Sequence, residues 1–188
     1  MLGGRAVAVR RVPVCMTGIP SPFGSQATDG GFDADDEFVP EHCPEPGSFL
    51  ADTSVLDGRE HAAFHRLTRD LFERRGVYDV TFGYNLARLN LDHRHPDAGF
   101  RYGVEPADAA VLRAEFTPTT PFCPQSDTLA TGAFRAWNGA LDRHEYDLVR
   151  VRVDDSHHRA AEINGRLTRL ATQFRETGVV PGAEAAED

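Results

Sequence analysis

The segment 110–132 constrains the fold of this chain most, because a strand pattern runs into two prolines there and a helix pattern follows them. Apolar side chains at every second position from Ala110 to Phe116 are typical of a strand with one buried face. Pro118 and Pro121 cannot donate to a β-ladder, so they end this strand in an extended loop. Beyond the loop, apolar residues recur at helical spacing: Leu129, Ala133, Phe134, Trp137 and Leu141.

Cys123 lies in this loop, directly before Pro124. Because proline suits the first position of a helix, the pattern predicts that Cys123 lies at or next to the helix N-cap. Unpaired backbone N–H groups and the positive end of the helix dipole stabilise a thiolate at that position. Cys123 is therefore a candidate reactive or metal-binding thiol. The alternative is a small buried residue that packs under Phe122.

Two separated motifs resemble one known family. Residues 117–123, Thr-Pro-Thr-Thr-Pro-Phe-Cys, resemble the Thr-x-Thr-x-Pro-x-Cys signature of small iron–sulfur cluster assembly domains. This family includes the SufT and PaaD proteins and the targeting subunit of the eukaryotic cytosolic iron–sulfur assembly machinery. Residues 155–157, followed by Ile163-Asn164 and Leu167, resemble the Gly-Thr-His…Ile-Asn-x-x-Leu segment of the eukaryotic branch. Two motifs in the same order are more specific than either one alone.

The resemblance extends over residues 54–175 and is close over 110–167. It implies an assembly or delivery factor that matures client apoproteins, with Cys123 as a ligand for iron or a cluster or as a docking thiol. The supporting residues that it implies are Thr117, Thr119, Pro121, His157 and Asn164. Because one thiolate cannot hold an iron–sulfur cluster, the cluster would be transient or bound at an oligomer interface. The implied partners are client apoproteins, other assembly factors and a second copy of the chain in a homodimer.

The same residues leave two other functions open. Cys123 with His157 as base and Asp155 as the orienting carboxylate is the residue set of a cysteine-dependent enzyme. A non-catalytic interaction module with an inert cysteine is the other alternative. The chain has no Gly-x-Ser-x-Gly motif, phosphate loop or dinucleotide fingerprint, so we predict that it is not an enzyme.

The charge balance and the cysteine count limit the classes of partner that the chain can bind and indicate its cellular compartment. The chain has 29 acidic and 20 basic residues, and a net charge of −9 repels nucleic acid backbones. No apolar run approaches the roughly 20 residues that span a bilayer. The 3 cysteines include no Cys-x-x-Cys pair, so they do not describe a disulfide framework. We therefore expect a cytoplasmic protein with no nucleic acid or membrane partner.

Residues 1–52 differ in composition from the rest of the chain. They are rich in proline and glycine, carry acidic residues at 33–37 and have few periodic apolar positions. We predict an extension that is poorly structured or lies over the domain surface, then a domain at 53–178 and an acidic tail at 179–188. Cys15 and Cys43 fall in the extension. A metal site of His42, Cys43 and Cys123 suits zinc or iron chemically. We instead expect Cys15 and Cys43 to be incidental thiols that bind no metal.

The remaining patterns predict the other elements. A first helix is capped by Ser54 or Asp57 and ends at Gly76, and a last helix is capped by Asp155 or Ser156 and ends at Gly178. Between them we expect a long or broken strand over 77–91, a loop over 93–109 and a strand over 146–153. The resulting order is helix, strand, strand, helix, strand, helix. This predicts an α+β fold with a small mixed β-sheet packed against helices.

Four histidines have spacings or positions that a metal site would use. His61 and His65 are one helical turn apart, and His93 and His95 lie in the expected loop. Because no Glu of a His-Glu-x-x-His motif accompanies the first pair, we predict that His61 and His65 are surface residues. We expect His93 and His95 to be polar residues at a loop tip rather than ligands.

Overall fold

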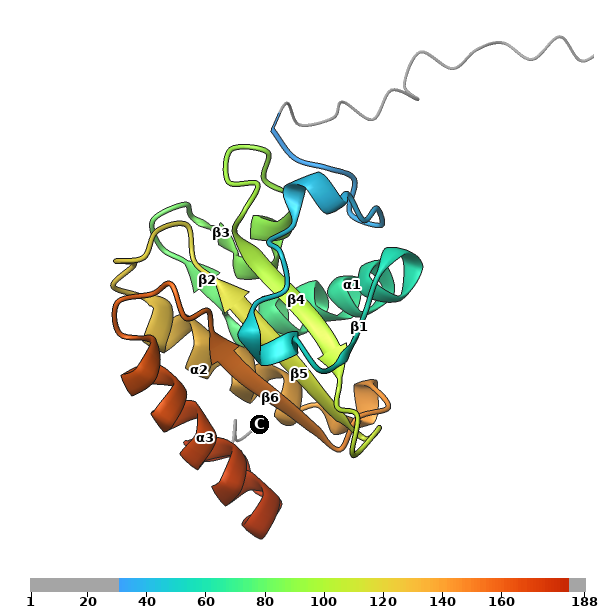
Figure 1. Cartoon of the computed structure of the whole chain (residues 1–188), viewed down its shortest axis with the longest axis vertical. Helices are drawn as coiled ribbons and strands as arrows, with labels where there is room; N and C mark the ends of the chain where they lie inside the picture. The colour runs from blue at the N-terminus through green and yellow to red at the C-terminus, as the bar shows by residue number, and fades with distance from the viewer. Residues whose placement is uncertain (1–30, 183–188) are drawn as a thin grey trace, which may run out of the picture.

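A four-stranded mixed sheet forms the centre of the computed structural model, which describes residues 31–182 (Figure 1). Its strands, in spatial order, are β1 (Ser54–Val55), β4 (Gly99–Val104), β5 (Val111–Thr117) and β6 (Leu148–Val153). β4 pairs antiparallel with both β1 and β5, whereas β5 and β6 are parallel. The predicted α+β fold with a small mixed sheet is confirmed.

Three helices pack against the sheet and against one another: α1 (Gly58–Arg75), α2 (Ser126–Asn138) and α3 (Ala160–Thr177). The core between them is aromatic, and Phe72, Phe100 and Trp137 are fully buried there. The Trp137 indole N–H donates to the hydroxyl of Thr68 on α1 at 3.1 Å, so the largest core side chain has its polar atom paired. None of the described helices is long and apolar enough to cross a bilayer.

The order α1, β4, β5, α2, β6, α3 matches the predicted order, but the first strand lies elsewhere. The prediction of a strand over 77–91 is wrong. That stretch forms a hairpin of β2 (Tyr78–Asp79) and β3 (Tyr84–Asn85), followed by the 3-10 helix η3 (Leu86–Leu91). Gly83 turns the chain at a φ of 71°, and the Asn85 side chain accepts from the N–H of Ala87 and so starts the helical turn.

β4 lies inside the segment that was expected to be a loop. It was missed because five of its six residues are buried, so it shows no alternation of apolar and polar positions. It also contains two glycines, which are depleted in strands. Gly103 is needed there, because a Cβ at that position would collide with the side chain of Thr53.

Residues 31–52 lie over the domain surface, as one of the two alternatives for the extension predicted. This segment contains the short 3-10 helices η1 (Pro40–His42) and η2 (Ser48–Leu50); η2 lies against β5, and Phe49 and Leu50 are buried. The backbone N–H groups of Gly47 and Phe49 donate to the buried carboxylate of Glu115 on β5 at 2.6 and 3.3 Å. The expected boundary at residue 52 therefore falls within a packed region.

The C-terminal boundary also falls in packed chain. Val180 is buried, and Arg135 on α2 donates to the carbonyl of Pro181 at 3.0 Å. The expectations for residues 1–30, including Cys15, and for 183–188 lie outside the described residues.

The predicted start and end of α1 and the predicted end of α3 are confirmed. Asp57 caps α1, and the left-handed glycines Gly76 and Gly178 end α1 and α3. The caps predicted for α3 are wrong, because this helix begins only at Ala160. Asp154 instead accepts from the N–H of Ser156 at 2.9 Å, and the chain makes a turn before the helix.

His61 and His65 are buried, so their prediction as surface residues is wrong. The face of α1 that carries them packs under Tyr102 and Phe38. The ring nitrogens of His65 contact the Tyr102 hydroxyl and the Ala87 carbonyl at 2.8 and 2.7 Å. Burial lowers the pKa of His65 to about 4 and that of His61 to about 2, so both imidazoles are neutral in the folded protein.

Deletion of residues 1–50 is expected to destabilise the domain relative to deletion of residues 1–30. The longer deletion removes buried Phe49 and Leu50, and losing one large buried side chain typically costs about 2–5 kcal/mol. It also leaves the Glu115 carboxylate without its two backbone donors. Urea denaturation of the two truncated proteins measures the difference. Equal free energies of unfolding would show that η2 adds nothing to the stability.

The buried histidines are expected to make the protein less stable as the pH falls from 6.5 toward 4. In this window the unfolded chain binds protons at both imidazoles and the folded chain does not, which costs about 1.4 kcal/mol per pH unit for each histidine. His61→Phe should halve this pH dependence without loss of stability at pH 7, because neither His61 nitrogen has a hydrogen-bond partner among the described residues. His65→Phe should be destabilising at pH 7, since it removes two hydrogen bonds. Urea denaturation at pH 7, 6 and 5 tests both variants, and an unchanged pH slope in His61→Phe would contradict the assignment.

Candidate functional site

Two consecutive turns hold Cys123 between β5 and α2. The N–H of Cys123 donates to the Thr120 carbonyl at 3.2 Å, and the N–H of Ser126 donates to the Cys123 carbonyl at 3.4 Å. Pro121 and Pro124 each occupy the second position of one turn, where the fixed φ of proline is favourable. Pro124 is therefore a turn residue, and the prediction that Cys123 lies at or next to the helix N-cap is wrong, because Cys123 lies two residues before the N-cap. α2 begins at Ser126, with Gln125 as its N-cap.

His157 holds the Cys123 loop from the side of β6. Its side chain is buried, and its Nε2 lies 3.1 Å from the Cys123 carbonyl oxygen. The backbone N–H of Arg159 donates to His157 Nδ1 at 3.2 Å, so Nε2 carries the proton and donates to Cys123. His157 therefore makes a polar contact before α3 and does not face the solvent.

His158 contacts the first turn of the same loop. Its backbone N–H donates to the Pro121 carbonyl at 3.0 Å, and its ring nitrogen Nδ1 lies 2.8 Å from the same oxygen. The ring also packs against Phe122, with centroids 5.2 Å apart. Residues 157 and 158 therefore bind the loop at both of its turns, on either side of Phe122.

Asn164 positions the strand that leads to these histidines. Its side-chain amide accepts from the N–H of Val153 at 2.8 Å and donates to the Val153 carbonyl at 2.9 Å. Val153 is the last residue of β6, and the N–H of the next residue, Asp154, donates to the Phe116 carbonyl at 2.9 Å. The two motifs of the sequence are thus adjacent in space.

The arrangement differs from that of a cysteine–histidine catalytic pair. Both ring nitrogens of His157 face backbone groups, so neither is directed at the Cys123 thiol. Asp155, the expected orienting carboxylate, accepts from the Ser48 hydroxyl at 2.5 Å. A base for Cys123 would have to come from another side chain.

The supporting threonines and Pro121 line a cleft of about 330 Å³ beside the cysteine loop. Residues 117–121 form one wall, residues 94–98 form the other, and Ser156 lies in the lining. Thr117 is the last residue of β5 and pairs with Gly99 of β4. Cys123 is partly exposed next to this cleft, and Phe122 is 72 % exposed.

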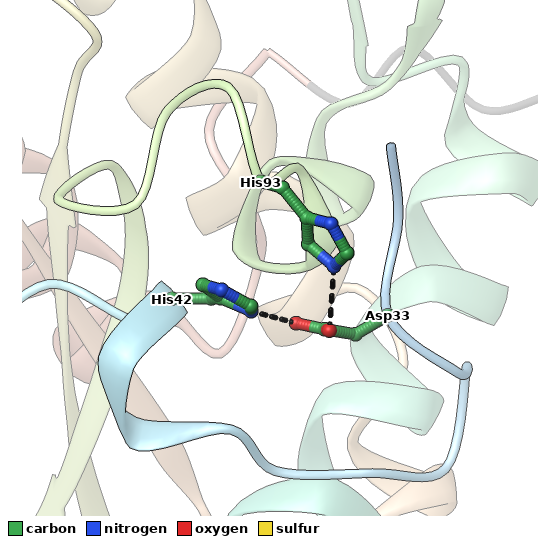
Figure 2. A group of neighbouring side chains, drawn as sticks. All are labelled: Asp33, His42 and His93. Carbon is green, nitrogen blue, oxygen red and sulfur yellow. Dashed lines mark hydrogen bonds and ion pairs between the residues drawn. The ribbon is translucent and has the colours of Figure 1, made fainter. Parts of the chain in front are cut away.

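A second group of polar side chains joins the covering segment, residues 31–52, to the loop after η3: Asp33, His42 and His93 (Figure 2). The Asp33 carboxylate lies between the two rings, with Oδ2 2.6 Å from His42 Nδ1 and Oδ1 2.7 Å from His93 Nε2. The two rings are 4.4 Å apart. One potential ligand atom from each residue lies within 4.8 Å of the others, so these three residues could hold a metal ion.

The structure does not form the metal site of His42, Cys43 and Cys123 that the sequence left open. Cys43 is buried, and its sulfur accepts from the Asn90 side chain at 3.6 Å. Burial raises the pKa of the Cys43 thiol. His42 is instead grouped with His93, which the sequence suggested only as a polar loop residue. Their proximity depends on the bridge between Phe32 and Asp92, for which the sequence carries no local signal.

Cys123 is expected to react with iodoacetamide faster than Cys43, because Cys123 is partly exposed and Cys43 is a buried thiol with a raised pKa. His157→Ala should increase the rate at Cys123 further, since it removes a hydrogen bond that holds the loop. Mass spectrometry of partly labelled native protein measures both rates. Slower labelling at Cys123 than at Cys43 would show that Cys123 is a packed structural thiol.

Comparison with known proteins places the chain in a family. A family model with the description "Domain of unknown function (DUF7998)" matches residues 30–181, a range that includes all the described helices and strands. No curated protein and no solved structure matches the chain. The chain therefore belongs to the family described as "Domain of unknown function (DUF7998)".

Proposed function

We propose that this protein is an iron–sulfur cluster assembly or delivery factor that helps to mature client apoproteins, with Cys123 as the ligand or docking thiol. The contact between the two family-like motifs carries the proposal. His157 of the second motif donates to the Cys123 carbonyl of the first, and Asn164 holds the strand end that positions His157. These contacts give the motif residues a shared role in presenting one thiol.

The surroundings of Cys123 suit a docking thiol. The loop is bound by hydrogen bonds to Pro121 and Cys123, so its backbone is held in place before a partner arrives. The exposed ring of Phe122 next to the thiol gives an apoprotein an apolar contact. The thiol and the ring together form a small surface that a second protein can cover.

Cluster binding would need ligands beyond those that residues 31–182 supply. An iron–sulfur cluster is held by several thiolates, and Cys43 is buried against Asn90 and cannot supply one in this arrangement. A second copy of the chain in a homodimer, another assembly factor or the client would provide the missing ligands. Iron or a cluster is thus a transient cargo, and the role requires a reduced thiol, as in the cytoplasm.

Replacement of Cys123 by serine is expected to lower the activity of iron–sulfur enzymes such as aconitase in the host while leaving the protein folded. A serine hydroxyl is a poor ligand for iron and for clusters. Phe122→Ala should also lower these activities, because it removes the apolar contact beside the thiol. His157→Ala should have a smaller effect than Cys123→Ser, since the imidazole acts through the loop backbone.

The matched control for Phe122→Ala is Val179→Ala, which removes another exposed apolar side chain and should change nothing. Enzyme activities are compared in host strains that carry each variant, and circular dichroism checks the fold. Unchanged activities in the Cys123→Ser strain, together with hydrolysis of ester or thioester substrates by the pure wild-type protein, would favour a cysteine-dependent enzyme instead.

A further inference from the structure

We propose that Asp33, His42 and His93 bind a divalent transition-metal ion, zinc or ferrous iron, at a site separate from Cys123. Two imidazoles and one carboxylate are a ligand set that these ions accept. Magnesium and calcium prefer oxygen ligands, so the two histidines select against them. Neither Cys43 nor Cys123 belongs to this group.

The distances suit a single ion. Zinc lies about 2.0–2.2 Å from nitrogen and oxygen ligands, so tetrahedral ligand atoms are roughly 3.3 Å apart. The pairs that Asp33 makes with His42 and His93 are closer than this, at 2.6 and 2.7 Å, and all three ligand atoms lie within 4.8 Å of one another. Small side-chain rotations therefore open the space for an ion. Each imidazole would bind it through the nitrogen that now faces Asp33, and the ring proton would occupy the other nitrogen.

The backbone around the ligands is fixed on both sides of the site. The N–H of Asp33 donates to the Leu91 carbonyl at 2.8 Å, and the N–H of His93 donates to the Gly31 carbonyl at 2.9 Å. These two bonds flank the bridge between Phe32 and Asp92, so Asp33 and His93 are held across a short antiparallel pair. Phe32 is further held by Arg88, whose guanidinium lies 4.3 Å from the ring centroid.

The third ligand is anchored independently. His42 ends η1 and directly precedes Cys43, whose buried sulfur accepts from Asn90. The site is thus built from two separate segments of the chain, as Figure 2 shows: Asp33 and His42 from the covering segment and His93 from the loop after η3. Ligands held by the backbone in this way lose little freedom when an ion binds.

The site is open on one side. The Asp33 side chain is only 11 % exposed, whereas the His93 side chain is 42 % exposed. Three protein ligands leave at least one coordination position for water or for an outside ligand, as in catalytic rather than closed structural zinc sites. The ion would also tie residues 33–42 to the loop that forms one wall of the cleft beside Cys123.

Metal titration of the full chain tests this proposal. Chelator-treated Cys123→Ser protein is titrated with Zn²⁺ and Co²⁺, and with Fe²⁺ under anaerobic conditions, so that Cys123 cannot contribute. We expect one ion per chain and a rise in Tm, because an ion that binds only the folded state stabilises it. Loss of a hydrogen-bonding partner of a ligand already costs about 10–100-fold in metal affinity, so Asp33→Asn, His42→Ala and His93→Ala should each cost about 100-fold or more.

The matched control is His95→Ala, which removes a histidine from the same loop and should leave the affinity unchanged. The Tm of each variant without metal shows that it is folded. Tight binding of either zinc or ferrous iron at one equivalent supports the site. Absence of stoichiometric binding, an affinity in the three ligand variants equal to that of the parent Cys123→Ser protein, or displacement of Zn²⁺ by millimolar Mg²⁺ would overturn it. The outcome of this titration does not depend on the iron–sulfur proposal, because that proposal requires Cys123 and the titrated Cys123→Ser variant lacks this thiol.

Discussion

The parallel pairing of β5 and β6 is the constraint on which the rest of the structure depends. Because parallel strands end at the same edge of a sheet, the loop after Thr117 and the segment after Val153 leave side by side, in the register that pairs Phe116 with Val153. β4 is antiparallel to β5 and begins at that edge, where Gly99 pairs with Thr117. Three loops therefore meet there and carry Cys123, His157 and the walls of the cleft.

Asparagine side chains form hydrogen bonds with strand backbone groups that have no partner in a neighbouring strand. Asn164 pairs with both backbone groups of Val153, and Asn138 pairs in the same way with Val149. Both act on β6, the edge strand of the sheet, so polar groups that would face the core or a neighbouring chain are satisfied internally. Asn90 makes the equivalent pair with Phe100 on β4.

The covering segment gives the opposite face of the sheet its own chemistry. Glu115 points away from the helices because its neighbours along β5 point into the core, and its carboxylate accepts hydrogen bonds from the N–H groups of Gly47 and Phe49. Burial is the largest influence on Glu115 and raises its pKa. The same segment places Asp33 and His42 next to His93. His93 directly precedes residues 94–98, which form one wall of the cleft beside the cysteine loop.

The sequence by itself determined the α+β class, the two strands that it predicts at 110–116 and 146–153 and that the structure has at 111–117 and 148–153, and the glycines that end α1 and α3. These features depend on periodicity and on local backbone preferences, which a short window of residues carries. It also indicated that His157 and Asn164 act near Cys123, although only through a resemblance. No pattern predicted the hydrogen bonds by which they do so.

Only the tertiary structure decided the remaining features. β4 is buried on both faces and so has no alternation, and His61 and His65 are buried because Tyr102 and Phe38 pack over them. Pro124 lies in a separate turn, closed by the hydrogen bond from Ser126 to Cys123, and α2 begins only at Ser126. The grouping of Asp33 with His93 required two segments far apart in sequence to pair. Contacts of this kind arise from packing and loop closure, which leave no local signal in the residues that make them.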